Sequence, residues 1–374
     1  MAIDPRTKNL ARILVEYSTS VRPGDHVAII SSPLARPLML EVFRQALRAG
    51  GYPYPFMGLE MLRGMDGFDE ILFKEANDEQ LRHVHRVDEM VINEFEVLIA
   101  IRSQGNTRAL SNVDPARQAI RQKARSALFA TQMERGSAKD LRWVGTLYPT
   151  QAYAQDADMS LEEFEDYVYG TTFADEEDPI ARWLEIHEQQ QRLVDWLKGK
   201  KRVEVKGPNV DMTLSIEDRI FVNSDGKNNM PSGEIFTGPV EDSAEGWVRF
   251  TYPAVNAGRE VEGIELQFEG GKVVKASAQK NDAYLHTMLD TDPGARFLGE
   301  FAIGTNKKIN RFIKNILFDE KIGGTIHMAV GAGYPETGSK NRSSIHWDMI
   351  CDMKDGGEIT VDGELFYRSG EFLI

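Results

Sequence analysis

Short apolar runs alternate with segments of helical period through the first half of the chain. The runs at residues 26–30 and 97–101 have the length of strands and are bounded by turn residues. Segment 36–49 has helical spacing and ends at Gly50-Gly51, which suits a left-handed helix stop. Such alternation predicts a mostly parallel sheet flanked by helices, to which strands at 52–57 and 143–148 would also belong.

Two further helices are predicted before residue 200. Ser160 and Glu163 have the spacing of a capping box, which marks a helix start. An acidic turn at 175–178 is followed by Pro179, and acids and proline favour the N-terminus of a helix. Gly199 would end this helix, so we predict an N-terminal α/β domain over residues 1–200.

The pattern changes after residue 200. Short strand-like segments bounded by glycine or asparagine dominate, and helical spacing returns only at 282–289 and around 307–317. This pattern predicts an α+β domain over residues 201–374 with a mainly antiparallel sheet. The predicted strands are 202–205, 212–215, 247–252, 263–268, 273–278, 326–330 and 358–361.

Composition narrows the class of protein. The formal net charge of −14 disfavours a nucleic-acid or anionic-membrane surface, because both would repel the chain. The N-terminus has no leader pattern and no apolar stretch reaches membrane-spanning length, so we expect a cytoplasmic protein. No glycine-rich dinucleotide motif follows the first strand. The single cysteine, Cys351, lies in an apolar stretch and is interpreted as a buried strand residue.

Histidines in strand-like runs are the first candidates for chemistry. His346 and Asp348 are two residues apart, so on a strand both side chains project from one face and can bind one ion. His327 lies in an apolar strand bounded by glycines, where an imidazole needs a partner. A single hydrogen bond would satisfy His327, and a His-x-Asp pair also arises by chance, so neither observation alone establishes a metal site.

Two glutamates have similarly unusual surroundings. Glu234 and Glu300 are each flanked by glycine and large apolar residues, where burial is costly unless the acid pairs or binds a cation. Each taken alone could equally be a capping or turn acid. Glu320, seven residues before His327, could support a ligand or be a solvated turn acid, and the turn acid is the favoured interpretation.

Several strings are similar to the signature blocks of the thermophilic metallo-aminopeptidase family, of the leucyl aminopeptidase type. They are GEIFTGPVEDSAEG, GEFAIGTN, IGGTIHMAVGAGYPETG and NRSSIHWDM, and the specific part spans residues 231–353. The resemblance implies removal of N-terminal residues from peptides with a free N-terminus, at a site of two divalent ions (Zn, Co, Mn or Mg). It also implies a homodimer whose sites face an internal cavity.

The resemblance further implies the roles of individual residues. The metal ligands would be Glu234, Glu300, His327, His346 and Asp348, with Glu300 touching both ions. Tyr334 would act with Glu300 in catalysis by hydrogen-bonding the oxyanion of the tetrahedral intermediate. Only eleven residues lie between Tyr334 and His346, a connection shorter than the family's, which places substrate preference in question rather than the chemistry.

Two other functions compete with the two-metal peptidase. Related mononuclear non-haem iron dioxygenases open hydroxypyridine rings with two histidines and one aspartate, which His327, His346 and Asp348 would supply. A one-iron site does not need Glu234 and Glu300, so both glutamates favour the peptidase. A non-enzymatic protein with a structural zinc is disfavoured, because such sites rarely lack cysteine ligands.

Overall fold

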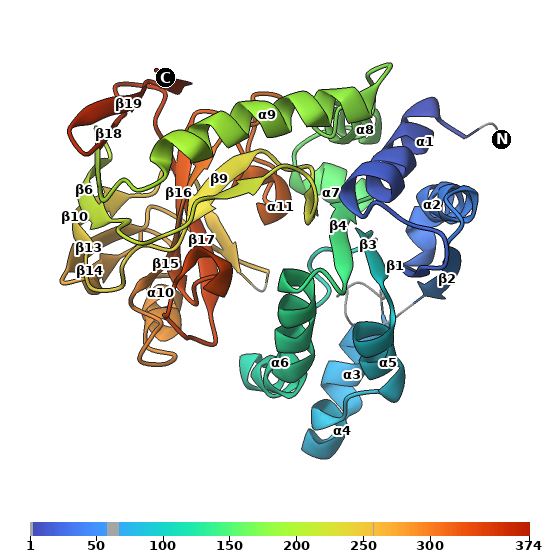
Figure 1. Cartoon of the computed structure of the whole chain (residues 1–374). Coiled ribbons are helices and arrows are strands. Elements are labelled where there is room, and N and C mark those ends of the chain that lie inside the picture. The colour runs from blue at the N-terminus through green and yellow to red at the C-terminus, as the bar shows by residue number, and fades with distance from the viewer. Residues whose placement is uncertain (1–2, 58–66, 257) are drawn as a thin grey trace. The chain divides into compact units, whose positions relative to one another are not determined.

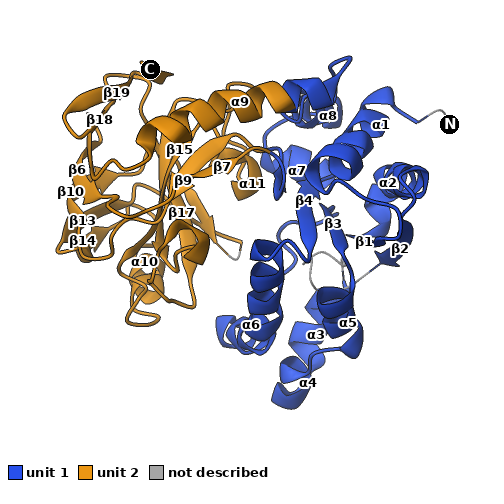
Figure 2. Cartoon of the chain, in the orientation of Figure 1, with its two compact units in different colours: residues 1–183, 226–231 blue, residues 184–225, 232–374 orange. Residues whose placement is uncertain are grey.

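The computed structural model describes residues 3–57, 67–256 and 258–374. Its chain divides into two compact units (Figure 2). Unit 1 comprises residues 1–183 and 226–231, and unit 2 comprises residues 184–225 and 232–374. Among the described residues, no helix is both long and apolar enough to cross a membrane.

Unit 1 contains the predicted parallel sheet (Figure 1). Its strand order is β2-β1-β3-β4-β8, and every neighbouring pair is parallel. The strands are β1 (His26–Ser31), β2 (Tyr52–Met57), β3 (Val97–Arg102), β4 (Arg142–Leu147) and β8 (Asn229–Met230). One face buries Ala28, Ile30 and Leu98 against Val91 and Ile92 of a helix, as expected for strands covered by helices.

The helices of unit 1 follow the predicted alternation in part, because the five helices found between residues 68 and 156 were not predicted. The capping box of Ser160 and Glu163 forms and opens α8. Helix α6 was not predicted, since Arg121 is its one buried residue and its apolar stripe is weak. The helices are α1 (Pro5–Arg12, followed by a π-helix at Ile13–Ser18), α2 (Arg36–Arg48), α3 (Phe68–Glu75), α4 (Asp78–Arg82), α5 (Arg86–Glu94), α6 (Pro115–Ser137), α7 (Gln151–Asp156) and α8 (Leu161–Thr171).

Unit 2 is built from antiparallel sheets, as predicted. The larger sheet, called sheet B, has the order β14-β13-β10-β6-β5-β18-β19-β20. Its strands are β5 (Arg202–Gly207), β6 (Val210–Ser215), β10 (Glu245–Arg249), β13 (Glu265–Glu269), β14 (Lys272–Ser277), β18 (Glu358–Val361), β19 (Glu364–Arg368) and β20 (Glu371–Phe372). A separate hairpin pairs β11 (Ala254–Asn256) with β12 (Arg259–Val261).

A second antiparallel sheet, called sheet C, packs into the same hydrophobic core as sheet B. Its order is β17-β16-β15-β9-β7, and its inner strands β15 and β16 are buried along their whole length. The strands are β7 (Val222–Ser224), β9 (Glu234–Thr237), β15 (Leu298–Gly304), β16 (Thr325–Gly331) and β17 (His346–Asp352). Unit 2 also contains the helices α10 (Asp282–Leu289) and α11 (Ile316–Asp319), together with part of a helix that begins in unit 1.

Two predicted features differ from the structure. The units part between Trp183 and Leu184, inside α9 (Pro179–Leu197), and not at residue 200. The reason is that Leu193 and Leu197 on the second half of α9 pack in the core of unit 2. The helix predicted around residues 307–317 is also wrong, since only α11 is helical there and Lys314 adopts a left-handed conformation.

Candidate metal centre

Sheet C brings all five predicted ligands together. Glu234 opens β9, Glu300 lies in β15, His327 lies in β16, and His346 and Asp348 lie two apart on β17. These four strands are neighbours in the sheet. The two glutamates and His327 are almost completely buried. Burial of these groups is costly unless each pairs or binds a cation.

The register explains why the side chains converge. Ala329 on β16 pairs with Glu300 on one side and with Asp348 on the other. Residues opposite one another in a sheet project from the same face, so these carboxylates share a face with His327, which lies two residues before Ala329. The side chains on this face of the sheet therefore converge.

A β-bulge adjusts the position of Glu300. The register between β15 and β16 shifts between Leu298 and Glu300. The intervening Gly299 lies so close to the next segment that a Cβ atom there would be 2.2 Å from the carbonyl oxygen of Ala332. Bulges redirect side chains next to functional sites, and here the bulge requires glycine.

The contacts form two overlapping groups that share Glu300. Its Oε1 lies 3.5 Å from Nε2 of His327, and its Oε2 lies 3.2 Å from Nε2 of His346. Glu234 approaches His327 at 3.3 Å, and Asp348 approaches His346 at 3.4 Å. Ligand atoms of Glu234, Glu300 and His327 lie within 4.8 Å of one another, as do those of Glu300, His346 and Asp348.

The hydrogen bonding of this cluster suits a divalent cation. Nδ1 of His346 lies 2.7 Å from the carbonyl oxygen of Ala332 and donates to it, which leaves Nε2 for an ion. Within this cluster, three buried side-chain atoms of the predicted ligands make no hydrogen bond: Glu234 Oε2, His327 Nδ1 and Asp348 Oδ1. Buried polar atoms without a hydrogen bond are rare in folded proteins. A bound cation would account for them here, because Zn, Co and Mn bind carboxylate oxygens and imidazole nitrogens.

The pKa shifts of these side chains also favour positive charge within the cluster. Burial opposes protonation of the histidines, but Glu300 and Glu234 outweigh it and raise the pKa of His327 to about 9. The pKa of His346 is raised well above its ordinary value despite burial, chiefly by Asp348. Burial opposes the charge of Asp348, yet His346 and His327 lower its pKa to about 2. Protons and metal ions compete for such a cluster.

Glu320 and Lys321 also belong to the cluster, contrary to the interpretation of Glu320 as a solvated turn acid. Ligand atoms of Glu320, His327 and Asp348 lie within 4.8 Å of one another. Burial is the main cause that raises the pKa of Glu320 to about 7. Lys321, which the sequence analysis missed, is fully buried, pairs with Glu320, and lies 3.6 Å from Glu234. Lys321 precedes β16 by four residues, with Ile322 and two glycines between them.

Tyr334 lies beside the predicted ligands. Its ring centroid is 5.1 Å from that of His346 and 5.4 Å from that of Phe236 on β9. Burial raises the pKa of its phenol well above the ordinary value, and the nearby charge of Glu300 adds to this effect. The phenol therefore stays protonated and can donate a hydrogen bond.

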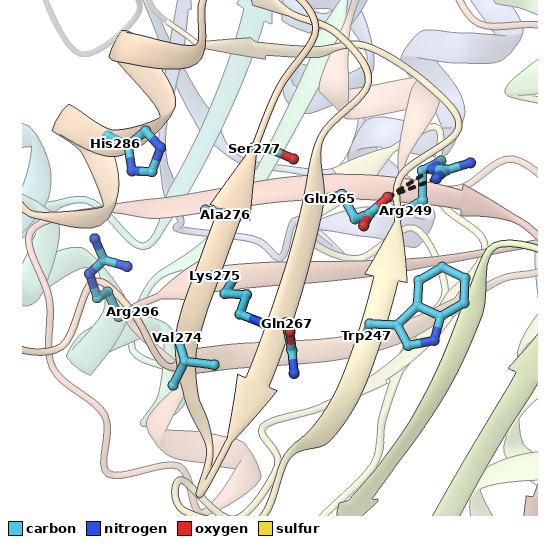
Figure 3. Close-up of a pocket in the computed structure, with 10 residues that line it drawn as sticks. All are labelled: Trp247, Arg249, Glu265, Gln267, Val274, Lys275, Ala276, Ser277, His286 and Arg296. Atoms are coloured by element: carbon cyan, nitrogen blue, oxygen red, sulfur yellow. Dashed lines mark hydrogen bonds and ion pairs between the residues drawn. The ribbon is translucent and has the colours of Figure 1, made fainter.

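A separate groove lies on sheet B and contains none of the predicted ligands. It has a volume of about 900 Å³ and is bordered by β10, β13 and β14, with His286 and Arg296 at its side (Figure 3). Both of its arginines are paired: Arg249 with Glu265 at 2.9 Å, and Arg296 with Asp290 at 2.7 Å. The predicted metal ligands all lie on sheet C.

Several known proteins are similar to this chain over most of its length. Aminopeptidase 2 of Geobacillus stearothermophilus is 27% identical over 97% of this chain and 96% of its own length. Aminopeptidase T of Thermus thermophilus is 29% identical over 72% of each chain. The solved structure of wild-type AmpT from Thermus thermophilus matches the whole of both chains with a TM-score of 0.86 at 21% identity.

A second solved structure is less similar to this chain and has the name of a different enzyme. The structure of 2,5-dihydroxypyridine dioxygenase from Pseudomonas putida KT2440 matches all of this chain and 98% of its own, with a TM-score of 0.58 at 15% identity. That identity shows a shared fold and nothing about activity. The family model described as thermophilic metalloprotease (M29) matches residues 3–372. The chain therefore belongs to the thermophilic metalloprotease (M29) family.

Proposed function

We propose that the chain is a metal-dependent aminopeptidase that uses two divalent ions. The family supports metal-dependent hydrolysis, and the relatives named aminopeptidases support removal of N-terminal residues. The observation that carries the two-ion assignment is Glu300, whose two oxygens face different histidines. In this arrangement Glu234 and His327 would bind one ion. His346 and Asp348 would bind the other ion, and Glu300 would contact both ions.

The roles of the protein groups follow from their positions. Two such ions, when bound, would lower the pKa of a water molecule and polarise the scissile carbonyl group. The protonated phenol of Tyr334 would donate a hydrogen bond to the oxyanion that develops there. Glu320, within reach of the same cluster, would accept the proton of the attacking water and return it to the departing amine. Lys321 would balance the charge of Glu234 and Glu320.

The one-iron dioxygenase is the competing assignment. His327, His346 and Asp348 would suffice for it. Glu234 and Glu300 are nevertheless buried between and beside the two histidines, within 3.2–3.5 Å of their Nε2 atoms. Two further buried carboxylates in direct contact with the ligands favour a second cation over a single iron. The homodimer, the cytoplasmic location and the choice among Zn, Co, Mn and Mg stay predictions.

Substitution of the glutamates tests this function. We expect Glu234→Gln and Glu300→Gln to lower hydrolysis of a leucyl dipeptide at least 100-fold and to lower the metal content below two ions per chain. Glu188→Gln, an exposed position on α9, is the matched control and should behave like the parent. Chelation should abolish the parent's activity, and added Zn, Co or Mn should restore it.

Full metal content and full rate in both variants would show that the two-metal assignment is wrong. One iron per chain with oxygen uptake on a dihydroxypyridine would support the dioxygenase instead.

A further inference from the structure

A buried glutamine on α9 connects the segments that carry two of the proposed ligands. Gln190 is 2% exposed. Its Nε2 carries two hydrogens and lies 2.6 Å from Asn223 Oδ1, 3.0 Å from the carbonyl oxygen of Ser224 and 3.3 Å from that of Glu234, so one hydrogen is shared between two acceptors. Its Oε1 accepts from the hydroxyl of Thr305 at 2.7 Å. One side chain thus joins α9 to the end of β7, the start of β9 and the residue after β15.

The start of β9 needs such a connection. The chain leaves unit 2 after Asp225 and returns at Ser232, so Glu234 opens its strand two residues after the return. Gly233 bonds to both neighbouring segments, donating to Ser224 at 3.2 Å and accepting from Thr305 at 2.9 Å. Strand ends fray when few groups hold them, and a ligand must be held within about 0.5 Å of its working position.

The orientation of the Gln190 amide is itself fixed. Asn223, which accepts from it, donates through Nδ2 to the carbonyl oxygen of His187 at 3.0 Å and to Gln191 at 3.2 Å, both on α9. Position 190 therefore needs a side chain that both donates and accepts hydrogen bonds. A carboxylate at position 190 would lose the donors, because an ionised acid only accepts hydrogen bonds.

We propose that Gln190 is a positioning residue for the metal centre, which holds the backbone of Glu234 so that its carboxylate is in place before an ion binds. The inference rests on the proposed function in one respect, namely that Glu234 is a metal ligand. Partners behind the ligands of metal sites commonly change affinity by about 10–100-fold when they are removed. Gln190 acts through the backbone, so the lower end of that range is expected.

The test is cobalt(II) binding to the chelator-stripped chain, followed by calorimetry and by the visible absorption of the bound ion. Gln190→Glu should weaken one of the two binding events about tenfold, leave the other within about twofold, and change the absorption of the weakened site. Gln189→Glu introduces the same charge at an exposed neighbouring position and should bind both ions like the parent. A role limited to folding would lower the melting temperature of the stripped chain without changing either affinity of the folded protein.

Thr305→Val provides a second, milder test, because it removes the hydroxyl that donates to Gln190 and keeps the side-chain shape. We expect about a threefold loss at the same ion as in Gln190→Glu. Folded Gln190→Glu with both parent affinities would overturn the proposal. If Gln190→Glu does not fold, parent affinities in Thr305→Val overturn it. A parent chain that binds two ions but hydrolyses no peptide would refute the proposed function and leave this inference standing.

Discussion

At the scale of single residues, Lys321 places one positive charge among four carboxylates. Glu234 and Glu320 pair with it directly, while Glu300 and Asp348 lie in the same cluster. Burial opposes the charge of Lys321, but Glu234 and Glu320 raise its pKa, so it stays protonated. Two divalent ions, when bound, would add four positive charges, so the lysine and the ions together would offset the four carboxylates.

Replacing Lys321 should therefore affect the metal-free protein most. Lys321→Met leaves buried carboxylates without their cation, and breaking a buried pair in this way costs about 3–5 kcal/mol. Bound ions would supply much of the lost charge, so we expect a larger fall in melting temperature with chelator than with excess zinc. Lys307→Met, at an exposed ion pair, is the control. An equal fall under both conditions would contradict the charge-balancing role.

Cys351 is the second residue whose behaviour follows from its surroundings. Burial is the chief cause that raises the pKa of its thiol to about 12, so we expect no reaction of the folded chain with a thiol reagent at pH 8 and one equivalent after unfolding. The unfolded thiol ionises near pH 8.5. Between that pH and 12 the unfolded chain binds fewer protons, so this residue lowers stability as pH rises. Rapid labelling of the folded chain would contradict this prediction.

The extent to which the site could be predicted depended on the cost of burial. Burial cost in apolar, glycine-bounded strands made Glu234, Glu300 and His327 candidates, but the set of five ligands was implied only by the family resemblance. Which of their atoms meet could not be predicted, because it depends on the register of four strands distant in sequence. Glu320 and Lys321 lie at the end of the short helix α11, where sequence spacing gives no direction for a side chain.

At the scale of elements, the bulge at Gly299 links strand geometry to the position of Glu300. Gly299→Ala would place a methyl group 2.2 Å from the Ala332 carbonyl oxygen. We expect a loss of about 2 kcal/mol or more in the free energy of unfolding, with weaker metal binding. Gly145→Ala is the control, since its methyl group would meet only ordinary contacts at 3.8 Å. Chemical denaturation and metal titration measure the two effects, and a stable Gly299→Ala chain that binds metal normally would contradict the argument.

Elements with a strong apolar period were predicted well, and elements governed by distant contacts were not. Strands β1 and β3 are buried apolar runs, as predicted. The segment around 307–317 has helical spacing, but Asp319 accepts from the backbone of Ile313 at 2.8 Å and of Asn315 at 2.7 Å. These bonds hold the segment in turns. Tertiary contacts thus override local preference there.

At the scale of the whole molecule, every proposed ligand lies in unit 2. Metal should therefore stabilise unit 2 selectively, because a ligand that binds only the folded state stabilises it by about 2.7 kcal/mol at one hundred times its Kd. For a unit of this size the melting temperature would rise by roughly 5–10 °C. Hydrogen exchange with and without zinc locates the effect. Protection should rise in β9, β15, β16 and β17 and stay unchanged in β1 and β3, while Glu234→Gln should lose most of the rise. An equal rise in the sheet of unit 1 would show that the ions stabilise the chain as one cooperative whole.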